Sequence, residues 1–564
     1  MQRSLFPRWR IGGSIIASLV PALLVGQQLP PVERFMLLDS ATAASRRNDH
    51  AVAARLYQRL AADHPTDGEM WYKYAFASFY ASGRRDFTSG AAQAIEHGTF
   101  FFRERFAHEL AKAAAVQGDR AGAFDWIRRA LGWRYTPRTN LATDTIFRAY
   151  RSDPEFRELA GMLPDRPFTR EEGYRYDVRF LVGEARRLHA SFNRQAFSPR
   201  FDSLVSAIEA RIPSLNERQF AVELQRLVVA LEDGHTKVAL PPAARQLPLV
   251  LYLFDDGVYV VGGTDAGTEL IGSQIIRFGL RSAEEVIADL PAMVNRDNDQ
   301  GLKWVGAWTL TILDYLHALG ASDSEDSVSL TIRDRAGRTR KVRLAGGPLH
   351  SHAPAKLGPP PGENTATPLY LRNVRTPYWF TSLPEAAAVY FQFNQVAELP
   401  EEPMARFAPR LRAAIADPAV RHLIVDVRHN TGGNSFLFPP LLRLIGAFHD
   451  ADPDRRVFYL TSRHTFSAAQ NFSTNVDRLT DAIFVGEPTG SSPNFVGEGP
   501  NFFTLPFSGI RVTISNWYHQ FSFWPDSRQA LVPELPIPVR SVDYFAGRDA
   551  ALDAVLAIAA ARGR

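Results

Sequence analysis

The chain has 564 residues, of which 45% are hydrophobic and 22% are charged. These proportions exclude a disordered chain and a protein with many membrane spans, and the length implies several domains. The net charge is +4, from 64 basic and 60 acidic residues, so no nucleic-acid partner is indicated. Because cysteine is absent, a cysteine nucleophile, thiolate metal sites and disulfides are excluded as well.

Residues 1–30 have the pattern of an export signal. Arg3, Arg8 and Arg10 precede the apolar stretch IGGSIIASLVPALLVG, as in the charged and apolar regions of a signal peptide. No Ala-x-Ala cleavage site follows, so an uncleaved N-terminal anchor and a buried helix are the alternatives. We expect an exported protein, periplasmic or attached to the cell envelope if its source is bacterial. Any contact with a membrane is expected only through this segment.

Residues 40–165 are expected to form helical repeats. Asn48, Gly83 and Gly118 are spaced 35 residues apart, and alanine-rich amphipathic patterns follow them. Small alanines let paired helices approach closely, and glycine suits the turn between them. The region resembles tetratricopeptide repeats, which would offer a surface to a protein partner. A helical domain without repeats is the alternative.

The middle of the chain changes from helices to strands. Residues 168–245 predict a helical subdomain that ends in Asp233-Gly234-His235-Thr236. Residues 246–345 have alternating apolar residues and a turn at Asp255-Asp256-Gly257, which predicts a β-rich unit with a hairpin. A glycine-led strand followed by a helix start in this unit resembles part of a PDZ-type domain. The proline-rich residues 346–368 predict a linker or flap.

Residues 369–564 alternate strands with helices, which predicts an α/β core with a largely parallel sheet. The whole chain is therefore expected to be a multidomain α+β protein. Sites in parallel sheets form at the carboxyl ends of strands. One such strand end carries Asp426 and a turn that finishes in Gly432-Gly433, where glycines let backbone N–H groups approach a ligand closely, as an oxyanion hole requires. The alternative for this turn is a helix cap.

Ser467 is expected at another strand-to-helix junction, in Thr465-Phe466-Ser467-Ala468-Ala469. Small neighbours leave the hydroxyl accessible, and the N–H of Ala468 at the helix start can help to hold an oxyanion. The alternative is that Ser467 only caps the helix. A nucleophilic serine needs a base. His235 is the candidate, because it lies in a turn beside a glycine, between a long helix and an apolar strand.

In combination, these motifs resemble the tail-specific, or C-terminal processing, serine protease family. The resemblance runs from about residue 169 to residue 558, and four motifs in the family's order carry it: Asp233-Gly234-His235-Thr236, Asp426-x-Arg428-x-Asn430-x-Gly432-Gly433, Phe466-Ser467-Ala468-Ala469 and Gly486-Glu487-Pro488-Thr489-Gly490. It implies a serine-type peptidase that acts on peptide or protein substrates by acyl transfer. Ser467 would be the nucleophile, and Gly432, Gly433 and Ala468 would supply the oxyanion hole. An esterase would use the same residues.

The sequence departs from most members of the family in one respect, and this narrows the resemblance to one branch of the family. Many members activate the serine with a lysine shortly after the fourth motif, a place that falls here near residues 491–493. No lysine occurs from Thr489 to the C-terminus, so this pairing is excluded. The tricorn-like branch pairs its serine with a histidine instead, and His235 matches the motif of that histidine.

The acid that would orient His235 is Asp526 in this reading, because it lies at a suitable distance downstream of Ser467. Glu498 and Glu534 are the alternatives, and each of these acids could equally be a solvated surface group.

No cluster of metal-ligating residues and no phosphate loop stands out, so no metal and no other cofactor are expected. Two other functions stay open. Retinoid-binding proteins that resemble these proteases are lipophile carriers, and the aromatic residues 517–524 could line an apolar pocket or form a packed core strand. The chain could also act chiefly as a scaffold through its repeats.

Overall fold

The computed structural model describes residues 29–82, 84–98, 103–134, 138–191, 199–350, 355–358, 367–497 and 502–562. The predicted export signal, apart from its last two residues, lies outside this part of the chain. None of the helices in the described ranges is long and apolar enough to cross a membrane. The chain divides into two compact units, residues 1–160 and residues 161–564.

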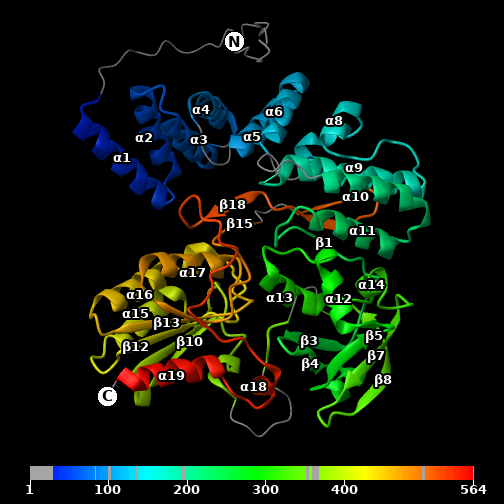
Figure 1. The fold of residues 1–564 in the computed structure, drawn as a ribbon. Coiled ribbons are helices and arrows are strands. Elements are labelled where there is room, and N and C mark those ends of the chain that lie inside the picture. The colour runs from blue at the N-terminus through cyan, green and yellow to red at the C-terminus, as the bar shows by residue number, and fades with distance from the viewer. Residues whose placement is uncertain are drawn as a thin grey trace, which may run out of the picture. The chain divides into compact units, whose positions relative to one another are not determined.

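The first unit is entirely helical in its described residues, and consecutive helices pack side by side (Figure 1). Fully buried alanines such as Ala41, Ala44 and Ala53 let α1 and α2 approach closely. Two of the predicted turn residues, Asn48 and Gly118, adopt φ values of +60° and +77° between helices, and the third lies outside the described residues. The elements are α1 (Pro31–Arg46), α2 (His50–Asp63), α3 (Gly68–Ser82), α4 (Arg84–His97), α5 (Arg103–Val116), α6 (Arg120–Gly132), α7 (Thr139–Thr143), η1 (Thr145–Tyr150) and α8 (Pro154–Leu159).

The second unit begins with helices that share a core with strands from near the C-terminus. Val178 and Leu224 pack in one cluster with Phe503 and Val512. The predicted helical subdomain is thus completed by residues about three hundred positions later in the chain. Its elements are α9 (Arg170–Leu188), α10 (Pro199–Arg211), η2 (Ile212–Ser214), α11 (Glu217–Val229) and a small sheet in the order β1 (Lys237–Val238), β17 (Arg511–Thr513), β16 (Phe502–Thr504).

An antiparallel sheet in the order β3-β4-β5-β7-β8 forms the next part. The predicted hairpin is confirmed, since Phe254 pairs with Gly257 across Asp255 and Asp256. The elements are β2 (Arg245–Gln246), β3 (Leu249–Phe254), β4 (Gly257–Gly263), η3 (Asp265–Leu270), β5 (Gln274–Phe278), β6 (Arg281–Ser282), α12 (Ala283–Asp289), η4 (Leu290–Ala292), α13 (Asp299–Thr309), α14 (Leu313–Ala318), β7 (Ser327–Arg333), β8 (Thr339–Ala345) and β9 (Gly347–Pro348).

The C-terminal part is the predicted α/β core. Its sheet has the order β10-β11-β12-β13-β14-β19, and every pair except the antiparallel β10–β11 is parallel. Helices α15, α16 and α17 cover one face and α19 covers the other (Figure 1). The elements are η5 (Leu369–Leu371), β10 (Tyr378–Leu383), η6 (Pro384–Ala386), β11 (Ala388–Phe393), α15 (Met404–Ile415), β12 (His422–Asp426), η7 (Ser435–Leu437), α16 (Pro439–Asp450), β13 (Arg456–Thr461), α17 (Ala468–Leu479), β14 (Ile483–Gly486), β19 (Leu535–Pro536), α18 (Ser541–Phe545) and α19 (Ala550–Arg562).

The aromatic residues 517–524 do not form a packed core strand, so that expectation is wrong. They begin with β18 (Trp517–Gln520), which pairs only with β15 (Asn494–Gly497) in a two-stranded ribbon. Trp517, Phe523 and Trp524 are 47%, 72% and 73% exposed. A ribbon of two strands has no second sheet layer over it. Trp517, Phe523 and Trp524 therefore stay in solvent, whereas Phe495 in β15 is buried and Phe521 packs against the α/β core.

Candidate active site

Ser467 lies at a sharp turn between β13 and α17, with a φ of +57° and a ψ of −124°. A residue with a β-carbon rarely adopts this backbone, and such strain amounts to about 1–3 kcal/mol. The Ser467 side chain makes no capping hydrogen bond to α17, so the helix-cap alternative is not what the structure shows. The hydroxyl is half-buried and free for another role.

The loop after β12 brings two glycines against this turn. A β-carbon on Gly432 would lie 2.7 Å from the Ser467 β-carbon and 2.8 Å from the Ala468 nitrogen. The φ values of Gly432 and Gly433 are +102° and +139°, which glycine alone adopts readily. The close approach of the two loops therefore requires glycine at position 432.

The three predicted oxyanion donors differ in whether their N–H groups are already hydrogen-bonded. The Gly432 N–H is donated to Oδ1 of Asn430 at 3.0 Å. The N–H groups of Gly433 and Ala468 have no acceptor among the described residues. Since Ala468 is the first residue of α17, its free N–H belongs to the positive end of the helix. Gly433 and Ala468 thus remain available to an incoming oxygen.

The turn that carries His235 is fixed through its backbone. Oδ1 of Asp233 accepts hydrogen bonds from the N–H groups of His235 at 2.8 Å and of Thr236 at 2.7 Å. The other Asp233 oxygen is 3.0 Å from Nε2 of His189. Burial raises the pKa of Asp233, but the hydrogen bond and charge of His189, together with hydrogen bonds from Ser515 and Thr236, outweigh it and hold that pKa below its usual value. Asp233 is therefore an ionised anchor within the turn.

The His235 ring is packed between two phenylalanines. Its centroid is 4.4 Å from Phe466 and 5.3 Å from Phe495, with interplanar angles of 23° and 6°. Since Phe466 precedes Ser467, this packing brings the histidine beside the serine turn. Neither ring nitrogen makes a hydrogen bond of ordinary geometry among the described residues, so no hydrogen bond joins His235 to Ser467 here. The backbone of Val496 in β15 lies close enough to the ring to raise the His235 pKa, against the larger effect of burial. Burial lowers the pKa of His235 to about 4, and the ring is neutral at neutral pH.

Neither Asp526 nor Glu534 binds this ring. Asp526 accepts hydrogen bonds from Ser522 at 2.5 Å and from Arg528 at 2.8 Å. The hydrogen bond from Arg528 lowers the pKa of Asp526 to about 2. Glu534 is exposed and accepts the N–H of Phe484 near the start of β14, at the opposite end of the sheet from Ser467. Glu498 lies outside the described residues.

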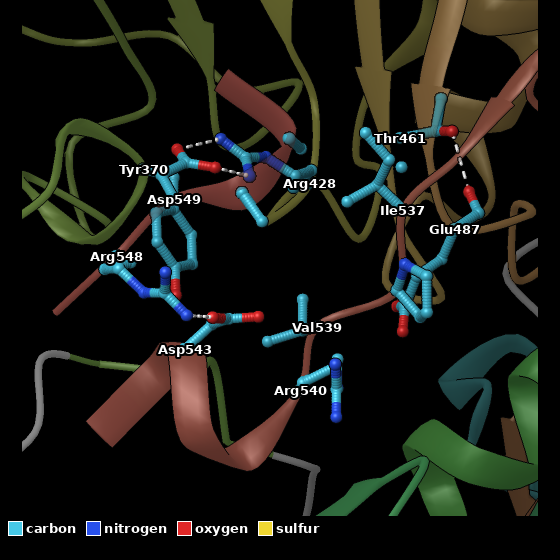
Figure 2. A pocket seen from close by; sticks show the side chains of 14 residues that line it. Tyr370, Arg428, Thr461, Glu487, Ile537, Val539, Arg540, Asp543, Arg548 and Asp549 are labelled. Atoms are coloured by element: carbon cyan, nitrogen blue, oxygen red, sulfur yellow. Dashed lines mark hydrogen bonds and ion pairs between the residues drawn. The ribbon is translucent and has the colours of Figure 1, made fainter. Parts of the chain in front are cut away.

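The second motif also builds a buried ion cluster (Figure 2). Arg428 forms hydrogen bonds with both oxygens of Asp426 and, at 2.8 Å each, with both oxygens of Asp549. The guanidinium carbon lies 4.5 Å from the centre of the Tyr370 ring. The adjacent cavity has a volume of about 20 Å³, enough for about one water molecule. This cluster joins α19 to the sheet and offers no room for a substrate.

A second buried pair, missed by the sequence analysis, holds the loop before Ser467. Both Arg463 and Glu487 are almost fully buried, and they are joined side chain to side chain. Arg463 also donates to the carbonyl of Leu253 in β3. Glu487 belongs to the Gly-Glu-Pro-Thr-Gly motif, but an arginine placed two residues after a strand has no distinguishing pattern in sequence.

An apolar cavity of about 180 Å³ lies next to the same loop. It is bounded by β3 and α13 and by His464, three residues before Ser467. Trp304, which lines this cavity, also packs against Phe466, with 5.3 Å between the ring centroids. The lining residues are Gln246, Leu249, Val250, Leu251, Tyr252, Lys303, Trp304, Ala307, Trp308, Thr311, His350, Ala355 and His464.

In the part of the chain that the structure describes, no group of three or more histidine, aspartate or glutamate side chains is arranged to hold a metal ion.

No family model matches the sequence, and no curated protein matches it. Among solved structures, the chain is similar to mature CPAF, with 14% identity over 68% of this chain and 96% of that chain and a TM-score of 0.47. It is similar to the photosystem II D1 C-terminal processing protease, with 15% identity over 68% and 99% and a TM-score of 0.34. It is also similar to the tricorn protease, with 14% identity over 71% and 38% and a TM-score of 0.34.

Proposed function

We propose that this chain is a serine-type peptidase that cleaves peptide bonds by acyl transfer, with Ser467 as nucleophile and His235 as general base. The observation that carries the proposal is the backbone of Ser467. A serine occupies a strained turn between a strand and a helix, and its hydroxyl does not cap that helix. The N–H groups of Gly433 and Ala468, near this turn, have no acceptor in the described part of the chain. Strain of this kind is typical of active sites, and a serine on such a turn is typical of hydrolase nucleophiles.

In this mechanism His235 accepts the proton of the Ser467 hydroxyl as the oxygen attacks a substrate carbonyl. The N–H groups of Gly433 and Ala468 hold the negative charge that develops on the carbonyl oxygen. His235 then returns the proton to the leaving amine, and water releases the acyl group by the same steps in reverse. The low pKa of His235 keeps the base unprotonated at neutral pH.

The first step needs a Ser467–His235 hydrogen bond, which is formed when substrate binds, since catalytic hydrogen bonds often tighten only in the substrate complex. The proposal assigns no carboxylate to the His235 ring. Asp526 stays the predicted acid of the triad. It could orient His235 only after its hydrogen bond with Arg528 is broken.

The test is covalent labelling of the full-length protein with a fluorophosphonate probe, combined with turnover of a fluorescent casein. Wild-type protein should label at Ser467, identified by mass spectrometry, and should cleave casein. Ser467→Ala should abolish both activities while the melting temperature is retained. The matched control is Ser435→Ala, which removes a neighbouring serine that accepts from Asn471 and should keep both activities. A wild type that never labels at Ser467 would refute the proposal.

A carrier for an apolar ligand is the second candidate, and the cavity beside His464 is the place where such a ligand would bind. Its volume of about 180 Å³ is below the roughly 300–1,000 Å³ of sites for drug-sized ligands. The cavity suits a single apolar side chain better than a long lipophile. Within the peptidase proposal, it would accept one such side chain of the substrate. Cleavage of peptide libraries that vary one position at a time should therefore show an apolar preference.

Export through residues 1–30 and capture of a protein partner by the N-terminal helices are further parts of the proposal. The apolar stretch after three arginines supports export, and the repeated helix pairs support a binding surface. Cell fractionation with N-terminal sequencing of the mature protein tests export. Retention in the cytoplasm with Met1 present would contradict it.

A further inference from the structure

The His235 turn is held by carboxylates from two separate parts of the chain. Asp233, within the turn, accepts the N–H groups of His235 and Thr236. Asp297 comes from the loop between η4 and α13, and its Oδ1 accepts the N–H of Gly234 at 2.7 Å. Three consecutive N–H groups of the turn thus point to carboxylate oxygens. These backbone contacts restrain the position of His235, together with the packing of its ring between Phe466 and Phe495.

Asp297 also connects the turn to the segment that follows the Gly-Glu-Pro-Thr-Gly motif. The hydroxyl of the fully buried Ser491 donates to Oδ2 of Asp297. The next residue, Asn298, strengthens the same junction by donating its side-chain N–H to the carbonyls of Thr489 at 3.0 Å and Gln529 at 2.7 Å. One short loop therefore ties the β-rich part to the α/β core and to the histidine turn.

The junction is closely packed around the turn. A β-carbon on Gly234 would lie 2.9 Å from Oδ1 of Asp297 and 2.9 Å from the Phe466 ring. The glycine lets the carboxylate reach the backbone from one side while the aromatic ring supports it from another. Loss of the Asp297 contact would free the end of the turn that is adjacent to His235.

We propose that Asp297 is a positioning residue for His235: through Gly234 and Ser491 it holds the imidazole between Phe466 and Phe495. This inference rests on the proposed function. Asp297 is not a catalytic residue, because it touches the backbone of the turn and neither reacting group.

The contact requires a hydrogen-bond acceptor and does not require a negative charge. Burial raises the pKa of Asp297 to about 7, and the nearby Asp233 charge adds to this effect. A protonated carboxyl or an amide oxygen accepts from the Gly234 N–H as well. An asparagine at position 297 should therefore keep the hydrogen bond to Gly234, whereas an alanine should lose it.

The experiment measures fluorophosphonate labelling of full-length protein from pH 4 to pH 9, with four variants compared to wild type: Asp297→Asn, Asp297→Ala, Ser491→Ala and the exposed neighbour Asp299→Ala. The groups whose charges act on the His235 ring, namely Asp233, His519 and Lys237, stay unchanged in all four. Melting temperatures are measured in parallel. Carbethoxylation of His235 by diethylpyrocarbonate, mapped by mass spectrometry, reports ring exposure without any need for activity.

Asp297→Ala should lower the maximal labelling rate about ten- to a hundred-fold with little change in the probe concentration at half-saturation, the size expected for a displacement of about 1 Å. Its pH midpoint should rise from about 4 towards the ordinary value of 6.5, because a loosened ring becomes solvated. His235 should react faster with diethylpyrocarbonate. Asp297→Asn and Asp299→Ala should match wild type, and Ser491→Ala should show a smaller loss.

Three results would overturn the inference. In the first, Asp297→Ala lowers the melting temperature but leaves the pH midpoint and the His235 modification rate unchanged. In the second, Asp297→Asn loses as much labelling as Asp297→Ala. In the third, His235 is modified equally in all variants. If wild-type protein does not label at Ser467, the proposed function fails, and the modification rates still decide whether Asp297 holds the turn. If Asp297→Ala does not fold, the same comparison is made with Ser491→Ala.

Discussion

Gly432 and Ser467 are in such close contact that a β-carbon on Gly432 would lie 2.7 Å from the β-carbon of Ser467. Gly432→Ala must therefore move the Ser467 turn and also hold alanine at a φ of +102°. We expect a loss of about 1–3 kcal/mol in the free energy of unfolding and loss of most fluorophosphonate labelling. Urea unfolding and labelling rates measure the two effects.

Gly446→Ala is the control for this substitution. Gly446 lies within α16, where an added β-carbon would meet nothing within 4 Å. Alanine there should stabilise the protein by about 0.5–1 kcal/mol and leave labelling unchanged. Equal effects of the two substitutions would show that the contact with Ser467 has no importance.

The buried Arg428–Asp549 pair predicts a large effect on stability (Figure 2). Asp549→Ala removes two hydrogen bonds from a buried guanidinium and one from the N–H of Leu552 in α19. Removing one partner of a buried pair costs about 3–5 kcal/mol. In Arg548→Ala, by contrast, the pair with Asp543 involves a side chain that is 61% exposed, and the loss should be below about 1 kcal/mol. Similar losses in both variants would contradict this assignment.

Three buried histidines predict that stability decreases in mild acid. Burial lowers the pKa of His235 to about 4 and the pKa values of His429 and His464 to about 3, from an ordinary 6.5. Between these values the unfolded chain binds protons that the folded chain does not. The free energy of unfolding should therefore fall as the pH decreases from 6.5 towards 3. Each histidine contributes a slope of up to about 1.4 kcal/mol per pH unit.

The measurement is urea unfolding at a series of pH values. His429→Phe keeps a ring beside Tyr370 and should reduce the proton uptake on unfolding by about one. An unchanged slope in this variant would show that His429 is not held neutral in the folded protein.

The described site residues all belong to residues 161–564, the second compact unit. A fragment of these residues should label at Ser467 at a rate within about a factor of two of the full chain, because it contains every described residue of the site. Circular dichroism establishes that the fragment is folded. A folded fragment that does not label would show that the N-terminal helices complete the site.

Several elements of the fold could be predicted from sequence because their patterns are local. The hairpin at Asp255–Asp256, the parallel core and the junction at Ser467 each follow from spacing within a short segment. For residues 517–524 the sequence leaves a pocket lining and a packed core strand open, because an apolar run does not reveal whether a second layer covers it.

The details of the site depend on contacts across long stretches of sequence. Distance along the chain alone predicts Asp526 as the triad acid, yet its hydrogen bonds come from Arg528, two residues away, and from Ser522. Asp297 lies in a polar run, Asn295-Arg296-Asp297-Asn298-Asp299, in which no pattern marks one carboxylate. Only the folded chain brings it to Gly234. Gly432 was expected to supply an oxyanion donor, but a side chain two residues away, Asn430, takes its N–H.

At position 467 stability and activity favour different residues. Glycine adopts a φ of +57° and a ψ of −124° without the strain that serine bears there, so Ser467→Gly should unfold at a higher temperature than wild type while it cleaves nothing. Selection of a mutant library for heat resistance alone should therefore enrich glycine at position 467. Serine would be retained there only if the library were also selected for turnover.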